Sequence, residues 1–227
     1  TYAALTPNMQ GYQRAVSVGA NEVAIFSAAS EAFSQKNTNC SIAETIERFA
    51  PIMEAAEQAD IPVRGYVSCV VGCPYEGEIS SQQVIHVTQR LLDLGCYEVS
   101  LGDTIGVGTA YRTKALLTDI QSSINSEQLA LHFHDTYGQA LANQYVALEL
   151  GYRTFDSSVA GLGGCPYAKG ASGNAATEDL VYMLQQSGLH TGIQLEQLVK
   201  AGQDICQILN RPNQSKVANA LTCTAPA

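Results

Sequence analysis

Two histidines separated by one residue are the clearest candidates for chemistry in this sequence. His132 and His134 lie in the segment LHFHD, which ends at Asp135. On an extended strand the side chains of residues i and i+2 point to the same face, so both imidazoles can approach one ion. Imidazole ligands next to a carboxylate suit a divalent metal that is completed by oxygen ligands and water. The alternative interpretation is a pair of core histidines that hydrogen-bond to backbone carbonyls.

A glycine-rich segment, GLGGCPYAKGASGN at residues 161–174, carries a single thiol, Cys165. It is not a nucleotide-binding motif, because GxxxxGK[ST] is absent and Pro166 occupies the position of the last glycine in G-x-G-x-x-G. We interpret the glycines as a flap that closes over a site, excludes water and brings Cys165 to a substrate as a proton donor or acceptor. The alternative for a buried thiol is a small apolar filler of the core.

Three further polar residues follow the glycine-rich segment or a predicted strand. Asn174 can offer a carbonyl oxygen to a metal, and Glu178 lies one helical turn later on the same side. Asp103 lies in SLGDTIG, where a predicted strand ends, and it can accept a proton or orient a substrate hydroxyl. The alternatives are a turn residue for Asn174 and an Asx turn or helix cap for Asp103.

The cysteines indicate reduced thiols. There are seven, an odd number in a chain large enough to fold without disulfides, which favours a cytosol-like compartment. Cys69 and Cys73 in SCVVGCPYEG have a spacing compatible with zinc or a disulfide, but no second pair has a matching spacing. We interpret this segment as a strand end that turns into a loop containing Gly and Pro.

Composition narrows the class of partner. With 227 residues, of which 46% are hydrophobic, the chain can bury a substantial core. Its formal net charge of -9 and its scattered basic residues argue against a nucleic-acid or acidic-membrane partner, because phosphates attract clustered Lys and Arg. No run approaches the ~20 apolar residues of a membrane span. A small-molecule partner is therefore expected, with no nucleic acid and no membrane.

Six β-rich runs, each followed by a helical pattern, must position these residues. The runs cover residues 2–6, 22–26, 63–69, 97–103, 129–135 and 154–160. Their starts differ by 20 to 41 residues, which is the length of βα units. Ser41 with Glu44, and Ser80 with Gln83, match capping boxes at helix starts. A last helix is predicted over residues 195–209, followed by a polar tail.

The polar residues that end nearly every run favour a barrel. Carboxyl ends of parallel strands gather at one face, and a ring of functional groups there is typical of the active face of a (β/α)8 TIM barrel. About six of the eight βα units are present, so we predict one catalytic α/β domain over residues 1–227 that is N-terminally incomplete, with two units expected before Thr1. The alternative is a complete open sheet of six strands.

Four segments resemble the 3-hydroxy-3-methylglutaryl-CoA lyase family: LHFHDTYGQALAN, VSLGDTIGVGT, RGYVSCVVGCPYEG and DSSVAGLGGCPYAKGASGNAATEDLVYML. The resemblance runs from Thr1 to about Ala220, and the cysteine-containing loop distinguishes the lyases from related isopropylmalate and homocitrate synthases. It implies a TIM barrel that uses Mg2+ or Mn2+ to split an acyl-CoA substrate into acetyl-CoA and acetoacetate. It also implies a homo-oligomer such as a dimer, located in the cytoplasm of a bacterium or the mitochondrial matrix of a eukaryote. A related aldolase or acyl-CoA/2-keto acid synthase is the alternative.

The resemblance also implies roles for individual residues. It makes His132, His134 and Asn174 metal ligands and Cys165 the catalytic thiol. Asp103 and Glu178 match the other active-site acids, and either His132 or Asp103 could serve as the base that removes the substrate's hydroxyl proton. Asn37 and Arg64 fall within matching motifs and are expected to support substrate binding.

One departure from the family pattern concerns its first strand. That strand carries an arginine-aspartate pair that supplies a further metal ligand and an oxyanion-stabilising charge, and nothing in this sequence matches it. The pair is expected in the units before Thr1. A catalytically incomplete fragment is therefore the third hypothesis, beside the lyase and the related synthase.

Overall fold

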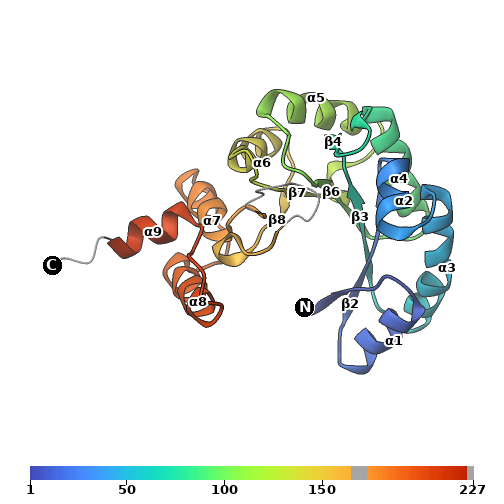
Figure 1. Cartoon of the computed structure of the whole chain (residues 1–227), viewed down its shortest axis with the longest axis horizontal. Helices are drawn as coiled ribbons and strands as arrows, with labels where there is room; N and C mark the ends of the chain where they lie inside the picture. The colour runs from blue at the N-terminus through green and yellow to red at the C-terminus, as the bar shows by residue number, and fades with distance from the viewer. Residues whose placement is uncertain (165–172, 224–227) are drawn as a thin grey trace.

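A computed structural model describes residues 1–164 and 173–223 (Figure 1). Its centre is a six-stranded sheet in the order β1-β2-β3-β6-β7-β8. The strands are β1 (Ala3–Leu5), β2 (Glu22–Ala28), β3 (Val63–Ser68), β6 (Glu98–Asp103), β7 (Leu129–Phe133) and β8 (Thr154–Asp156).

Strand order decides between the two predicted architectures. Each strand of this sheet pairs in parallel with the next one along the chain, so the order never reverses. A doubly wound sheet reverses at a switch point, whereas a barrel advances in one direction. The described residues therefore form a half-barrel of the TIM type, and the prediction of six βα units of such a barrel is confirmed.

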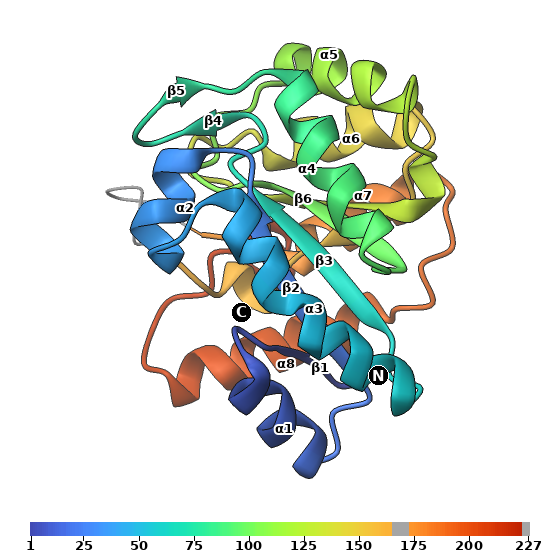
Figure 2. The same ribbon diagram turned by 90° about the vertical axis from the view of Figure 1, so that its right-hand side faces the viewer.

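Helices cover the outer face of the curved sheet. The connections between successive strands contain α1 (Met9–Ser17), α3 (Ile42–Gln58), α4 (Ser81–Asp93), α5 (Ala110–Gln121) and α6 (Ala140–Glu149), and Figure 2 shows β3 between α3 and α4. An extra helix, α2 (Glu31–Thr38), follows β2, and the short 3-10 turns are η1 (Ser126–Gln128) and η2 (Val159–Gly161). None of the described helices is long and apolar enough to cross a membrane.

On β6 and β7 the outer face is apolar and the inner face carries polar side chains. On β6, Val99 and Leu101 are fully buried in the core beneath the helices. On β7, Leu129 and Leu131 belong to the same core, whereas His132, the residue after Leu131, faces a cavity on the inner side. Because side chains alternate along a strand, burying the apolar set against the helices necessarily turns the polar set inward.

Local sequence signals set the helix starts. Ser41 and Glu44 form the predicted capping box at α3, with the Glu44 carboxylate accepting from the Ser41 N–H at 2.8 Å. At α4 the structure shows the hydroxyl half of the second box, in which Ser80 Oγ accepts from the Gln83 N–H at 3.2 Å. These contacts satisfy backbone groups that a helix start leaves without partners.

Two predicted segments differ in the structure. The strand predicted over 154–160 ends at Asp156, because η2 begins three residues later and Ala160 adopts a left-handed conformation with φ 57°. The loop predicted around Cys73 is a small antiparallel hairpin of β4 (Gly72–Cys73) and β5 (Gly77–Glu78). Gly77, the first residue of β5 after the turn, has φ 78°, a conformation that glycine adopts without strain.

The polar tail predicted after residue 209 is wrong. The segment contains α9 (Lys216–Cys223), which packs with α7 (Thr177–Gln186) and α8 (Leu195–Ile208) beyond β8 (Figure 1). The carboxylate of Asp179 accepts from the backbone N–H groups of Lys216 and Val217 and from the Ser215 hydroxyl. Asp179 thus caps this helix from a distant part of the chain, a contact that local sequence does not reveal.

We predict that Ile52→Ala lowers the free energy of unfolding by about 2–5 kcal/mol, because it opens a cavity in the core. Ile52 of α3 is 0% exposed. The matched control is Ile208→Ala, at an isoleucine of α8 that is 78% exposed and should change stability by less than about 0.5 kcal/mol. Denaturant unfolding checks both, and equal effects would contradict the assignment of the core.

Candidate active site

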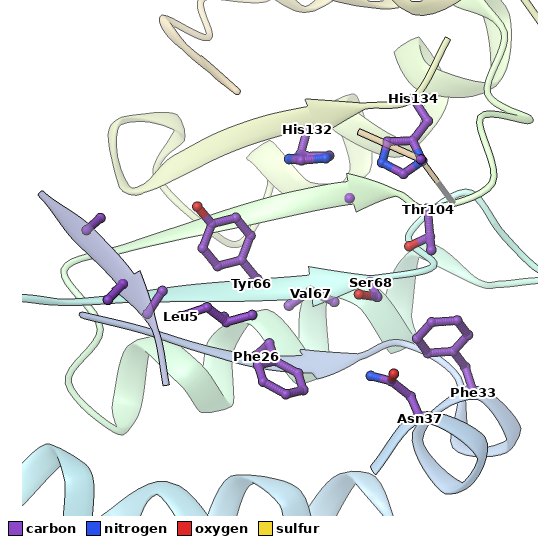
Figure 3. Close-up of a pocket in the computed structure, with 15 residues that line it drawn as sticks. Leu5, Phe26, Phe33, Asn37, Tyr66, Val67, Ser68, Thr104, His132 and His134 are labelled. Carbon is purple, nitrogen blue, oxygen red and sulfur yellow. The ribbon is translucent and has the colours of Figure 1, made fainter. Parts of the chain in front are cut away.

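A cavity of about 560 Å³ occupies the inner side of the half-barrel (Figure 3). One wall is apolar and includes Leu5 of β1 and Phe26 of β2. The opposite wall is polar and includes Thr104, His132 and His134 from the ends of β6 and β7. An apolar pocket with a few convergent polar groups is the usual form of a small-molecule site.

The structure brings the two histidines together on the same face. His132 lies within β7 and His134 follows its last residue, and both line the cavity (Figure 3). Their ring centroids are 5.3 Å apart. Burial, with a smaller contribution from repulsion by His132, lowers the pKa of His134 to about 4, and a hydrogen bond to the Thr104 backbone opposes the shift. His134 is therefore a neutral imidazole at physiological pH, the form that binds metals.

Asn174 joins the histidines through a backbone bridge. It pairs with His134 as an isolated antiparallel bridge, and its Nδ2 donates to the Leu162 carbonyl at 3.0 Å. This hydrogen bond fixes the amide, so that Oδ1 is the acceptor left over. Oδ1 of Asn174 and Nδ1 of His134 are both buried and have no hydrogen-bond partner within residues 1–164 and 173–223.

The chemistry of His134 Nδ1 and Asn174 Oδ1 shows that a metal fits between these residues. A buried polar atom without a partner costs free energy unless a ligand satisfies it, and both atoms can supply a lone pair. A nitrogen and a carbonyl oxygen suit a divalent cation. Among the described residues no group of three or more His, Cys, Asp or Glu could hold a metal.

Asp156 is a polar neighbour of His132 that the sequence analysis missed. Its Oδ2 lies 3.4 Å from His132 Nδ1, and it also accepts from Arg64 and Ser100. Burial alone would raise the pKa of Asp156, but His132, Arg64 and Ser100 together outweigh it and hold the pKa below its ordinary value. A signal was present, since Asp156 ends the β-rich part of TFDSSVA in the strand next to the histidines.

The two expected substrate-binding residues differ in position. Asn37 of α2 lines the cavity. Arg64, near the amino end of β3, is almost fully buried and bonds to Glu98, Asp156 and the Tyr66 hydroxyl. It is not among the residues that line the cavity, so the structure places it beneath the cavity rather than in it.

Asp103 and Glu178 also lie away from the cavity. Asp103, at the end of β6, is on the same strand face as Leu101, and its carboxylate accepts from the N–H groups of Val107 and Gly108 at 3.1 and 2.7 Å. These donors lie four and five residues after Asp103, so the contact is neither the Asx turn nor the helix cap given as alternatives, and Thr109 caps α5 instead. Glu178 of α7 is fully buried and accepts from the Ala160 N–H at 2.9 and 3.0 Å. Burial raises the pKa of both carboxyl groups. Their predicted catalytic roles are not tested by these contacts.

Cys165 lies outside the described residues, and its role stays a prediction. The preceding residue, Gly164, is described and lines the cavity. At the other end of the segment, Gly173 has φ 95°, and its carbonyl accepts from the Asp135 N–H at 2.9 Å. Both described ends of the glycine-rich segment are therefore close to the site.

Comparison with known proteins identifies the family. The sequence model of the HMGL-like family matches residues 1–205. The chain belongs to the HMGL-like family. Relatives of this HMGL-like chain include mitochondrial hydroxymethylglutaryl-CoA lyase from Mus musculus, 60% identical over 98% of this chain and 68% of the relative. A 3-hydroxy-3-isohexenylglutaryl-CoA/hydroxymethylglutaryl-CoA lyase from Pseudomonas aeruginosa is 57% identical over 99% of this chain and 75% of the relative.

Solved structures of HMGL-like lyases have the same fold. The crystal structure of hydroxymethylglutaryl-CoA lyase from Pseudomonas aeruginosa matches with a TM-score of 0.97 at 57% identity, over 99% of this chain and 75% of that one. A lyase from Acinetobacter baumannii, in complex with coenzyme A and 3-methylmalate, matches with a TM-score of 0.91 at 37% identity, over 100% of this chain and 74% of that one.

We predict that Asp103→Asn lowers the free energy of unfolding of this HMGL-like protein by about 1–3 kcal/mol, because an amide cannot accept both backbone N–H groups. The matched control is Asp119→Asn, at an exposed aspartate of α5 that should change stability by less than about 0.5 kcal/mol. Denaturant unfolding measures both. Unchanged stability with a large loss of activity would instead favour the catalytic role for Asp103.

Proposed function

We propose that this chain cleaves 3-hydroxy-3-methylglutaryl-CoA into acetyl-CoA and acetoacetate by a metal-assisted retro-Claisen reaction. The observation that carries this proposal is 57–60% identity to hydroxymethylglutaryl-CoA lyases over nearly the whole chain. The reaction breaks the bond between carbons 2 and 3 after the tertiary hydroxyl loses its proton. The site must therefore hold the hydroxyl, remove its proton and protonate the acetyl-CoA enolate at carbon.

His134 and Asn174, with His132 beside them, are the residues that would hold a divalent cation, which we propose to be Mg2+ or Mn2+. The lone pairs of His134 Nδ1 and Asn174 Oδ1, which are buried without partners among the described residues, support this assignment. When bound, such a cation polarises the substrate oxygens and lowers the pKa of the tertiary hydroxyl.

His132 is the better supported of the two candidate bases. It lines the cavity, whereas the Asp103 carboxylate is engaged by two backbone N–H groups behind the sheet. A general base must come within hydrogen-bond reach of the proton it removes. Since Nδ1 of His132 faces Asp156, its Nε2 is the atom that would ligate the cation in the absence of substrate. Nε2 could remove the substrate proton only when it is not a ligand, and His134 and Asn174 would then hold the cation.

Cys165 is proposed to protonate the enolate. The thioester stabilises the carbanion, so a weak acid such as a thiol suffices. Asn37 is proposed to help bind the acyl-CoA substrate, because it lines the cavity beside the apolar wall.

The proposal also covers the domain organisation, the oligomeric state and the cellular compartment of the protein. Residues 1–227 form one catalytic domain, which the unbroken family match over 1–205 supports. The protein assembles as a homo-oligomer such as a dimer. It works in the cytoplasm of a bacterium or the mitochondrial matrix of a eukaryote, in line with relatives from both sources.

The direct test is incubation of the chain with 3-hydroxy-3-methylglutaryl-CoA and Mn2+. We predict equal amounts of acetyl-CoA and acetoacetate, a loss of turnover on chelation and recovery when Mn2+ is restored. His134→Ala should abolish turnover and weaken Mn2+ binding in calorimetry, whereas His86→Ala, at an exposed histidine of α4, should do neither. Consumption of acetyl-CoA with a 2-keto acid would indicate a synthase, and Mn2+ binding without turnover would indicate a catalytically incomplete chain.

We predict that Cys165→Ser lowers kcat at least ~10²-fold, the loss typical of a missing general acid. Steady-state kinetics at saturating Mn2+ measure this. Cys223→Ser, at an exposed thiol, is the matched control and should leave kcat unchanged. Turnover of Cys165→Ser at the rate of the unmodified chain would refute the role.

A further inference from the structure

Asp156 lies where it can control the state of His132. It is the last residue of β8 and is the register partner of His132 on β7. We infer that Asp156 is a positioning residue that fixes the tautomer and orientation of His132, so that Nε2 presents its lone pair to the cavity. The inference rests on the proposed function only in taking this cavity as the place where His132 acts.

The contact between the two side chains decides which imidazole nitrogen carries the proton. Asp156 Oδ2 lies 3.4 Å from His132 Nδ1, slightly beyond the usual limit of about 3.2 Å for an N–H···O bond. A carboxylate only accepts hydrogen bonds, so a bare Nδ1 would place two lone pairs opposite each other. The hydrogen therefore resides on Nδ1, and Nε2 keeps the lone pair that a metal ligand or a base needs.

Two donors hold the carboxylate in this orientation. Arg64 Nη1 donates to Asp156 Oδ1 at 2.9 Å, and Ser100 Oγ donates to Oδ2 at 2.7 Å. Ser100 is fully buried and Arg64 nearly so. Rotation of the carboxylate would break one of these bonds without a solvent replacement, so Asp156 presents Oδ2 to His132 in a fixed direction.

Glu98 shares the positive charge of Arg64 with Asp156, so Arg64 does not fully neutralise the Asp156 carboxylate that faces His132. Arg64 Nε donates to Glu98 Oε1 at 2.7 Å, so one guanidinium is shared by two carboxylates. One positive and two negative charges leave one net negative charge in this partly buried group. It lies directly behind His132, where it favours an imidazole that donates from Nδ1 and a positive charge on the cavity side.

The replacement of Asp156 by asparagine gives a specific test, because the Arg64 donor determines which way the amide group is oriented. The amide oxygen has to face the Arg64 donor, which turns the NH2 group toward Ser100 and His132. The Ser100 hydroxyl can rotate to accept, but His132 must then present a bare Nδ1 and carry its hydrogen on Nε2. Asp156→Asn should thus reverse the tautomer and remove the lone pair from the cavity.

The primary measurement is the tautomer of His132 in the metal-free chain, read by NMR of 15N-labelled histidines at pH 8.5 and assigned with His132→Gln. We expect the Nδ1–H form in the unmodified chain and the Nε2–H form in Asp156→Asn. We also expect Asp156→Asn to lower Mn2+ affinity or kcat by ~10–100-fold. Asp204→Asn, which loses only a surface ion pair with Lys200, should change neither.

The outcomes separate this inference from the proposed function. An Nε2–H tautomer in the unmodified chain would overturn the positioning role even if the chain cleaves its substrate, and this readout does not require Asp156→Asn to fold. A tautomer, Mn2+ affinity and kcat that are unchanged in Asp156→Asn would overturn it as well. The expected tautomer reversal supports the role even if the assay shows a different substrate.

Discussion

The bridge between His134 and Asn174 is the contact on which the site depends. It joins the end of β7 to the end of the glycine-rich segment and sets two buried atoms with lone pairs beside a second histidine. Neither atom has a partner among the described residues, although burying such groups costs free energy. The fold bears this cost beside His132, on the inner face of the half-barrel. A cation bound between His134 and Asn174 would offset this free-energy cost by accepting both lone pairs.

The two faces of the sheet have different roles: the outer face contributes to the hydrophobic core, and the inner face carries the residues of the candidate site. Its outer face is filled with aliphatic residues packed beneath α3 to α6, and its inner face carries Ser100, His132 and the cavity. Below the cavity, Arg64 pairs with both Glu98 and Asp156, and the net negative charge of these three groups lies directly behind a functional histidine. A buried ion pair adds little to stability by itself but fixes orientation when every donor is used.

Sequence alone predicted the strands and the shared face of His132 and His134, because both follow from short-range periodicity. It could not predict that Asp103 and Glu178 point away from the cavity, since that depends on which distant N–H groups their carboxylates meet. Asp156 was missed for a related reason, because its partner on the neighbouring strand is set by register. The helix at the end of the described chain depends on Asp179, a cap supplied by α7.

The central claim is that His132, His134 and Asn174 converge on a single cation. A crystal structure of the chain grown with Mn2+, with anomalous scattering measured at the manganese edge, tests this most directly. The account predicts one anomalous peak between Nε2 of His132, Nδ1 of His134 and Oδ1 of Asn174. Full Mn2+ binding in solution with the peak elsewhere, or with the Asn174 oxygen turned away from it, would contradict the account.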